Sequence, residues 1–261
     1  MTTPAARTIA ALRAEYDELA KLASTLSPEQ LTGPSGADEW TVAQVFSHLG
    51  SGAEITLAGF RAGTGAAEAP GPDFNQGVWD RWNAMSPQDQ LAGWLAGDAE
   101  LIAAFEGLTP EQHETLKLKT FLPDPVPVAL FAGLRLNESA LHSWDIRVAV
   151  EPSTGVSAGT SELLAEHYAG DLSFLLGFIG KLDALTVPAV VDVDGSPYSL
   201  VLDGQARVAT GAAEPTATFT GPLEAAVRLI AGRLSPAYTA DGTTVTGNVT
   251  LDDLRRAFPG Y

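Results

Sequence analysis

The 261-residue sequence contains no cysteine, and this absence limits its chemistry. Without thiols the chain forms no disulfide, builds no thiolate zinc site and offers no cysteine nucleophile. Basic residues are also scarce, since 15 Lys and Arg stand against 32 Asp and Glu, for a formal net charge of −17. So acidic a chain repels nucleic-acid backbones and anionic membrane surfaces. We therefore expect neither nucleic acid nor a membrane among its partners.

Long apolar runs are missing as well. No run approaches the roughly 18 residues that a membrane span needs, and the first ten residues, MTTPAARTIA, lack the apolar stretch of a secretory signal. We therefore expect a cytoplasmic protein. Hydrophobic residues make up 45% of the chain and charged residues 18%, which is the composition of a folded globular protein. At roughly 100–200 residues per domain, the length predicts one large or two small domains.

The first part of the chain has the apolar spacing of helices. Leucines and aromatic residues recur every three or four positions, and Thr41 followed by Gln44 has the pattern of a capping box. A stretch rich in Gly, Ala and Pro at 62–77 predicts a loop. The predicted helices are 8–26, one beginning at Thr41, one beginning at Ser86–Pro87, 128–150 and 161–180.

The periodicity changes after residue 185. Residues 187–193 and 198–202 are typical of strands, and Asp194–Gly195 between them is a hairpin turn signal. A second such turn, a possible strand at 217–220 and helices at 223–234 and 251–258 follow. The predicted class is α plus α+β, with an all-α domain over 1–182 and a small α+β domain over 183–261.

Two of the four histidines, His48 and His142, lie inside strongly predicted helices of the first domain, and the helix of His142 also carries a glutamate. Glu138 precedes His142 by four residues, so both side chains lie on one face of a helix. His48, from a facing helix, can complete a set of three ligands, and helix bundles build metal sites in this way. Two histidines and one carboxylate, with a fourth position open, form the ligand set of catalytic zinc. The alternative is a chance spacing, in which the histidines are hydrogen-bonded core residues.

A family resemblance supports the metal site. The segment 39–49, EWTVAQVFSHL, resembles the second-helix motif of the mycothiol-dependent maleylpyruvate isomerase family, and the segment 137–147, NESALHSWDIR, resembles its E-x-x-x-H-x-x-D motif. These are DinB-like metalloenzymes of actinobacteria. The resemblance implies a DinB-like up-down four-helix bundle followed by a small domain like sterol-carrier folds. It also implies that His48, Glu138 and His142 are the metal ligands.

The same resemblance implies an activity. The family uses mycothiol, a low-molecular-weight thiol, with a divalent metal that we expect to be zinc, although nickel, iron and manganese accept similar ligands. The implied function is cis-trans isomerisation of a maleylpyruvate-like electrophile, or transfer of the thiol to such an electrophile. The family places a required arginine in its second domain, and the segment LIAGR makes Arg233 the catalytic candidate. The alternative role for Arg233 is a positive charge at a helix C-terminus.

Two further residues are candidates for the site. Asp145 follows His142 by three residues, so its carboxylate can orient that imidazole; the alternative is a surface pair with Arg147. Arg81, in the segment WDRW, is a candidate for binding the anionic groups of the cofactor; the alternative is a solvated arginine.

Two other classes of function stay open at this point. One is a metal-free protein that binds a small molecule or lipid, and the other is a zinc-bearing regulatory protein of the anti-sigma kind. An open set of three ligands followed by a second domain favours the enzyme. The sequence leaves the oligomeric state as monomer or dimer.

Overall fold

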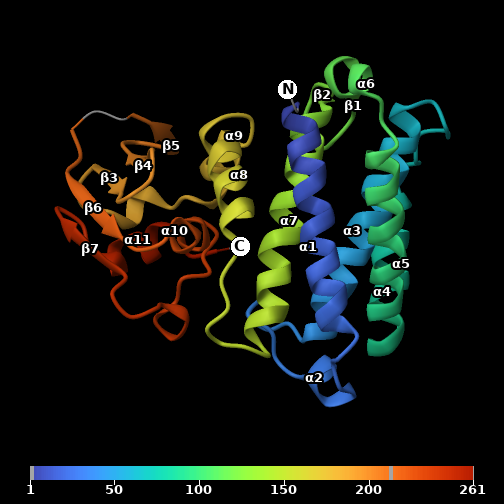
Figure 1. The fold of residues 1–261 in the computed structure, drawn as a ribbon, viewed down its shortest axis with the longest axis horizontal. Helices are drawn as coiled ribbons and strands as arrows, with labels where there is room; N and C mark the ends of the chain where they lie inside the picture. The colour runs from blue at the N-terminus through green and yellow to red at the C-terminus, as the bar shows by residue number, and fades with distance from the viewer. Residues whose placement is uncertain (1–2, 212–213, 261) are drawn as a thin grey trace. The chain divides into compact units, whose positions relative to one another are not determined.

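The computed structural model describes residues 3–211 and 214–260 and divides into two compact units, Met1–Thr154 and Gly155–Tyr261 (Figure 1). The predicted class, α plus α+β, is confirmed. The predicted domain boundary at 182/183 differs from this division, because the segment after Thr154 packs its helices on the sheet of the second unit.

The first unit is built from four long helices, which Figure 1 shows side by side. Its elements are α1 (Pro4–Ala23), α2 (Pro28–Thr32), α3 (Val42–Gly63), α4 (Phe74–Asn83), α5 (Pro87–Glu106), α6 (Pro110–Thr115), α7 (Val128–Val148) and the short antiparallel strands β1 (Lys117–Leu118) and β2 (Val126–Pro127).

Helix starts in this unit follow the polar caps of the sequence. The capping box predicted at Thr41 is confirmed, since the Thr41 side chain accepts from the Gln44 N–H and the Gln44 side chain accepts from the Thr41 N–H. Ser86 caps α5 by accepting a hydrogen bond from the N–H of Asp89, with Pro87 in the first turn. The predicted loop at 62–77 is shorter than expected, because α4 already begins at Phe74.

The directions of the four long helices follow from their contacts. Phe46 of α3 packs on Trp94 of α5, and about three to four turns further along both helices Phe60 packs on Phe105, so α3 and α5 run parallel. The intervening α4 makes this possible, because it lies between them in sequence and against α3 in space, and so returns the chain to the end at which α3 began. The bundle thus departs from simple up-down alternation at this step.

The second unit is an α+β layer structure around a five-stranded sheet of order β5-β4-β3-β6-β7. Its strands are β3 (Ala189–Val193), β4 (Tyr198–Leu202), β5 (Ala206–Thr210), β6 (Ala217–Thr220) and β7 (Thr244–Gly247). Its helices are α8 (Ala158–Ala169), α9 (Ser173–Ile179), α10 (Leu223–Ile230) and α11 (Leu251–Ala257), with 3-10 turns at Leu182–Ala184 and Pro236–Tyr238.

The two hairpin turns predicted from Asp–Gly pairs are present in this sheet, between β3 and β4 and between β4 and β5. Gly195 and Gly204 adopt positive φ angles of 74° and 86°, the left-handed conformation that tight turns need and glycine tolerates. Helix 161–180, predicted as continuous, is interrupted at Gly170, and α8 and α9 pack on each other and on β5. Among the strands that the structure describes, β3 and β6 pair in parallel and the other neighbours pair antiparallel.

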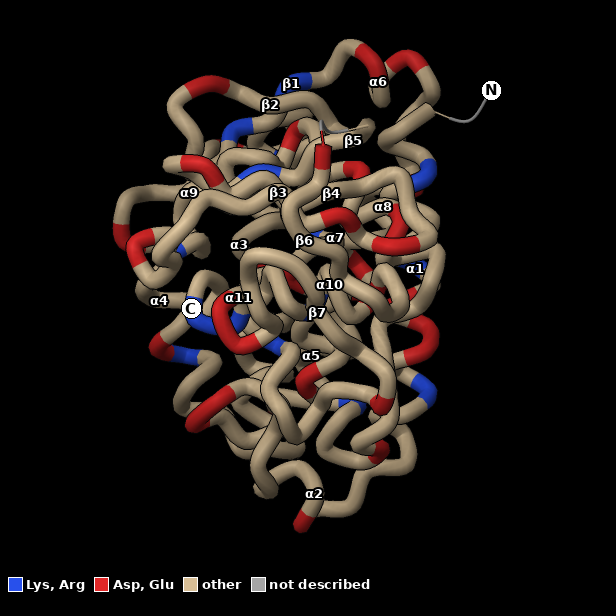
Figure 2. The backbone as a smooth tube through the Cα atoms, turned by 90° about the vertical axis from the view of Figure 1, so that its left-hand side faces the viewer, with Lys and Arg blue, Asp and Glu red and all other residues tan. Residues whose placement is uncertain are grey.

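Acidic residues outnumber basic residues along the chain, and Figure 2 shows this excess on the backbone. Across the described part of the chain, no helix combines the length and the apolar character that crossing a membrane requires.

Candidate metal centre

Three side chains from two helices of the first unit converge on one point. His48 lies on α3, while Glu138 and His142 lie one turn apart on α7. One ligand atom from each lies within 4.8 Å of the others, and no other such group of His, Asp and Glu occurs among the residues that were described. Nε2 of His48 is 3.0 Å from Oε2 of Glu138, and Nε2 of His142 is 3.7 Å from the same oxygen. The predicted set is therefore assembled in space.

A buried carboxylate fixes the ring of His142. Nδ1 of His142 donates a hydrogen bond of 2.8 Å to Oδ2 of Asp145, whose side chain is fully buried. The neutral ring then carries its proton on Nδ1 and its lone pair on Nε2, the atom that faces Glu138. Of the two roles considered for Asp145, the structure shows the contact with His142.

The alternative partner of Asp145 has other contacts. Arg147 lies 3.0 Å from a carboxylate oxygen of Glu15 and 3.2 Å from one of Glu18, both on α1. These ion pairs join α7 to α1, two helices that pack along each other.

The carboxylate of Glu138 is held in its charged form. Burial raises its pKa, but the hydrogen bond with His48 and the charges of His142, His48 and Arg135 outweigh this effect and lower the pKa to about 2. Glu138 is therefore an anion across the physiological range. A neutral His142, with its proton on Nδ1, would turn the lone pair of Nε2 toward this oxygen at 3.7 Å. A cation between these two acceptors would relieve their repulsion.

An aromatic side chain that sequence reasoning left without a role lies on this group. The indole of Trp40 is 5.1 Å from the ring of His48 and 5.8 Å from the ring of His142, measured between centroids. The signal in the sequence was its position, because Trp40 directly precedes the cap of the helix that carries His48.

A closed ion pair lies next to the three candidate ligands. The guanidinium of Arg135 donates to Oδ1 of Asp98 at 2.6 Å and to the carbonyl of Leu49 at 2.8 Å. Trp94 donates its indole N–H to the other oxygen of Asp98 at 2.8 Å. The side chains of Arg135 and Asp98 are only 4% and 6% exposed. Sequence reasoning missed this group, because no spacing rule pairs residues that are 37 positions apart.

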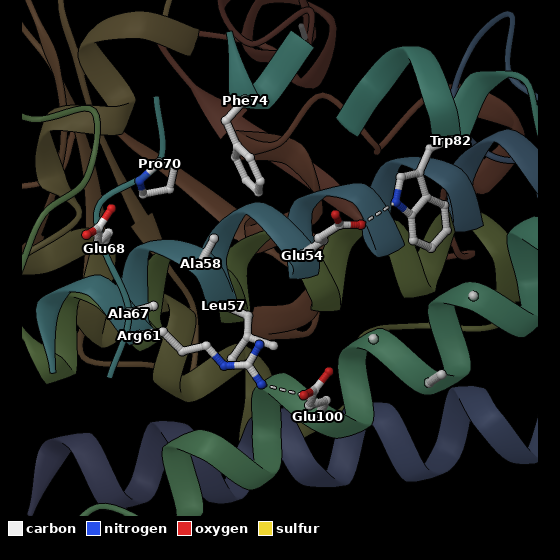
Figure 3. A pocket seen from close by; sticks show the side chains of 13 residues that line it. Glu54, Leu57, Ala58, Arg61, Ala67, Glu68, Pro70, Phe74, Trp82 and Glu100 are labelled. Carbon is white, nitrogen blue, oxygen red and sulfur yellow. Dashed lines mark hydrogen bonds and ion pairs between the residues drawn. The ribbon is translucent and has the colours of Figure 1, made fainter. Parts of the chain in front are cut away.

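Arg81, the candidate for cofactor binding, is engaged elsewhere in the unit. Its guanidinium lies 2.5 Å from Oε1 of Glu54, and Glu54 also accepts the indole N–H of Trp82 at 3.0 Å. Glu54 and Trp82 line a pocket of about 550 Å³ among α3, α4 and α5, at the far end of which Arg61 pairs with Glu100 (Figure 3). None of the three candidate ligands lines this pocket.

Arg233 lies in the second unit, in a loop that follows α10. The helix ends at Ile230, four residues before the end of the helix predicted at 223–234. Gly232 has a φ of 73°, and a Cβ on it would lie 2.3 Å from the backbone of Gly260, so only glycine fits there. The Arg233 side chain is half-buried and donates to the carbonyl of Ala231 at 3.0 Å.

The loop of Arg233 is held by a second arginine. Arg228, on α10, forms a two-point ion pair with Glu224, at 2.7 and 3.0 Å. Its remaining nitrogen donates to the carbonyls of Arg233 at 3.3 Å and Tyr238 at 3.0 Å. Arg228 therefore fixes the backbone at Arg233 and is itself occupied.

Comparison with known proteins gives concordant results. Residues 12–147 match the family described as the mycothiol maleylpyruvate isomerase N-terminal domain. Rv0036c of Mycobacterium tuberculosis, an uncharacterized protein, is 30% identical over 159 residues, which cover 56% of this chain and 58% of that protein. Rv0738 of the same organism, also uncharacterized, is 29% identical over 153 residues, which cover 59% of this chain and 71% of that protein. The chain thus matches little more than half the length of Rv0036c.

The fold is shared over a longer span. A crystal structure of the mycothiol-dependent maleylpyruvate isomerase superposes with a TM-score of 0.64 at 19% identity, covering 95% of this chain and 98% of that chain. A mutant of that enzyme superposes with a TM-score of 0.64 at 18% identity. At such identities the likeness shows a common fold, and it extends over both units.

Proposed function

The chain belongs to the mycothiol maleylpyruvate isomerase N-terminal domain family, and from this premise we propose that it is a thiol-dependent metalloenzyme. The observation that carries the proposal is the convergence of His48, Glu138 and His142, whose ligand atoms lie within 4.8 Å of one another. These three residues would hold one divalent metal, for which zinc is our first candidate.

The residues of the centre suit such a cation in kind and in charge. Imidazole nitrogen and carboxylate oxygen are common zinc ligands, and three protein ligands leave a position open. Together, Glu138 and Asp145 supply two carboxylates beside two imidazoles, so one divalent ion balances them. When bound, the metal lowers the pKa of a coordinated thiol and so makes a thiolate available at neutral pH.

The chain's own residues hold this centre ready. Asp145 keeps the proton of His142 on Nδ1, and the low pKa of Glu138 keeps its oxygens unprotonated. Because the chain has no cysteine, the thiol has to come from outside, and we propose mycothiol. The electrophile is a maleylpyruvate-like compound. If the thiol leaves after adding to the double bond, the outcome is cis-trans isomerisation; if it stays, the outcome is thiol transfer.

Arg233 is our candidate for binding a carboxylate of the substrate or of the thiol cofactor, because a guanidinium recognises a carboxylate at two points. Arg233→Ala should lower kcat/KM strongly while metal content and melting temperature stay near those of the unmodified protein. A small loss of stability with unchanged turnover would instead assign Arg233 to the α10 C-terminus, where a positive charge contributes about 0.3–1 kcal/mol.

Elemental analysis followed by a thiol assay tests the proposal. Untagged protein should contain one divalent metal per chain, and the double variant His48→Ala/His142→Ala should contain almost none. Loaded protein should convert a maleylpyruvate-like electrophile only when mycothiol is added. Full metal occupancy in the double variant would reject the ligand assignment. Stoichiometric metal without any thiol-dependent turnover would favour the regulatory class of protein, and absence of metal the metal-free binding class.

A further inference from the structure

Trp40 packs on both histidines of the candidate centre. Its ring planes are tilted by 48° to His48 and 20° to His142, and the two imidazoles themselves lie 4.6 Å apart at 62°. Centroid separations of 4.6–5.8 Å are those of favourable aromatic pairs. Three rings from two chain segments therefore form one cluster, in which the indole contacts both of the imidazoles.

The backbone that carries Trp40 is strained. Glu39 has a φ of 65°, and it is the one non-glycine residue with positive φ in the part of the chain that the structure describes. Such a conformation is costly for an ordinary residue and persists only where the surroundings enforce it. Here the enforcement is local, because the N–H of Ser35 donates to the carbonyl of Trp40 at 2.9 Å and the N–H of Trp40 donates to that of Ala37 at 3.3 Å.

The same segment is fastened to the helix that carries Glu138 and His142. The N–H of Gly36 donates to the carbonyl of Asp145 at 2.7 Å. The approach is close, since a Cβ on Gly36 would lie 2.6 Å from Cγ1 of Val148 and 3.0 Å from Cα of Asp145. Asp145 is also the residue whose carboxylate orients His142.

At its other end the segment runs into the helix that carries His48. Pro34 and Thr41 form an isolated antiparallel bridge, and the N–H of Val42 donates to the carbonyl of Gly33 at 3.0 Å. Thr41 is the cap of α3. Residues 33–41, which we call the indole clip, thus connect the two ligand-bearing helices and place Trp40 on the rings of both histidines.

We propose that Trp40 is a positioning residue of the metal centre, and that the indole clip holds the imidazoles of His48 and His142 in the orientations that one metal ion requires. This inference rests on the proposed function. Trp40 itself supplies no ligand atom. It restricts the rotation of two rings that would otherwise reorient, and it packs an apolar surface against both of them. Groups that orient metal ligands typically change metal affinity about 10–100-fold when they are removed.

Cobalt(II) alone is the probe, because its visible absorption reports ligand geometry and because a bound open-shell ion quenches nearby indole emission. In the unmodified protein, Co²⁺ should quench part of the tryptophan fluorescence. Trp40→Phe should lose most of this quenching, while the matched variant Trp79→Phe, at an exposed tryptophan of α4, should keep it. Equal quenching in Trp40→Phe and in the unmodified protein would overturn the inference.

Affinity is the second measurement. Trp40→Leu should bind Co²⁺ about 10–100-fold more weakly and with an altered visible spectrum, and Trp40→Phe, which keeps an aromatic ring, should recover part of the loss. Gly36→Ala should weaken binding without changing any ring, because its Cβ forces the clip away from α7. If Trp40→Leu fails to fold, Trp40→Phe and Gly36→Ala carry the test alone.

The outcomes separate this inference from the function on which it rests. If the unmodified protein binds no Co²⁺, the proposed metalloenzyme fails, and the role of Trp40 fails with it. A different result rejects only the role of the indole clip. In that case the unmodified protein binds Co²⁺, and the folded Trp40 variants and Gly36→Ala bind it with the same affinity and the same spectrum.

Discussion

Two charged groups lie side by side within the helical bundle, and they differ in how their charges are balanced. In the closed group, Arg135 and Asp98 form a buried ion pair that Trp94 and the Leu49 carbonyl complete. In the open group, the carboxylate of Glu138 faces two imidazoles, and the side chains of His48 and Glu138 are each 39% exposed. The closed group balances its charges with fixed protein partners, whereas the open group is accessible and lacks a comparable fixed cation among its three members.

The two groups are also adjacent along the chain. Leu49, whose carbonyl receives Arg135, directly follows His48, and Arg135 precedes Glu138 by one turn of α7. The closed group therefore holds α3 and α7 together close to the positions of the candidate ligands. We therefore assign stability to the closed group and metal binding to the open group, and both assignments can be tested by substitution.

The largest effect is expected from breaking the closed pair. Arg135→Met leaves the buried carboxylate of Asp98 without its ion-pair partner, and such losses destabilise proteins by about 3–5 kcal/mol. Chemical denaturation of the apo-protein measures the change. Replacing both partners, Arg135→Met with Asp98→Leu, should recover much of the loss, since the desolvated charge is then gone. A change below about 1 kcal/mol in the single variant would show that the closed group is not a stability element.

Glu138→Gln is the corresponding change in the open group, and its effect should appear in metal binding. The amide keeps the size of the side chain but removes the anionic ligand, so we expect zinc affinity to fall at least about 100-fold, or about 2.7 kcal/mol. The ionised Glu138, whose pKa is lowered in the folded state, also stabilises the apo-protein, but the variant should lose less stability than Arg135→Met, because Glu138 is more exposed than Asp98. Titration calorimetry with zinc and denaturation without it separate the two effects. A variant that is strongly destabilised but still binds zinc would reverse the assignment of the two groups.

Asp145→Asn should have a smaller effect on the same property. An amide oxygen still accepts from Nδ1 of His142, but it carries no charge to strengthen the imidazole as a ligand, so zinc affinity should fall about 10-fold, or about 1.4 kcal/mol. Competition with a zinc chelator measures this loss, with Arg147→Gln as the control for a change of one charge on the same helix. Equal zinc affinity in Asp145→Asn and in the unmodified protein would reduce Asp145 to a packing residue.

The open group could be predicted from the sequence, whereas the closed group could not. Glu138 and His142 lie at helical spacing, and Thr41 with Gln44 marks the start of the helix that brings His48, so local rules and one family resemblance suffice to assemble the set. Arg135 and Asp98 follow no local rule. Arg135 lies on α7 and Asp98 on α5, so their pairing depends on how helices that are distant in sequence pack in the bundle.

In the second unit, too, local features could be predicted from the sequence and contacts between distant elements could not. Its hairpins were predicted from Asp–Gly turns, which act over four residues. The break at Gly170 and the packing of α8 and α9 on the sheet depend on contacts with β5 and α10, which follow them in sequence. The division at Thr154 differs from the predicted boundary at 182/183 because α8 and α9 make their contacts with elements of the second unit.

The smallest effect is expected at Glu54, a carboxylate outside both groups. Burial raises its pKa, but hydrogen bonds from Arg81 and Trp82 outweigh this and leave the pKa below its usual range. A carboxyl with a lowered pKa in the folded state stabilises the protein above its unfolded pKa of about 4.3, and the contribution is lost as the pH falls through the folded value.

Glu54→Gln should therefore destabilise the protein only slightly at pH 7, by about 0.2–1 kcal/mol, because the pair with Arg81 is solvent-exposed and screened. This difference should shrink as the pH is lowered from about 4.5, and zinc affinity should equal that of the unmodified protein. Denaturation at a series of pH values, with and without zinc, measures both. A difference that grows on acidification would contradict the sign of the pKa shift. A loss of zinc binding would show that the pocket of Glu54 and the open group act as one site.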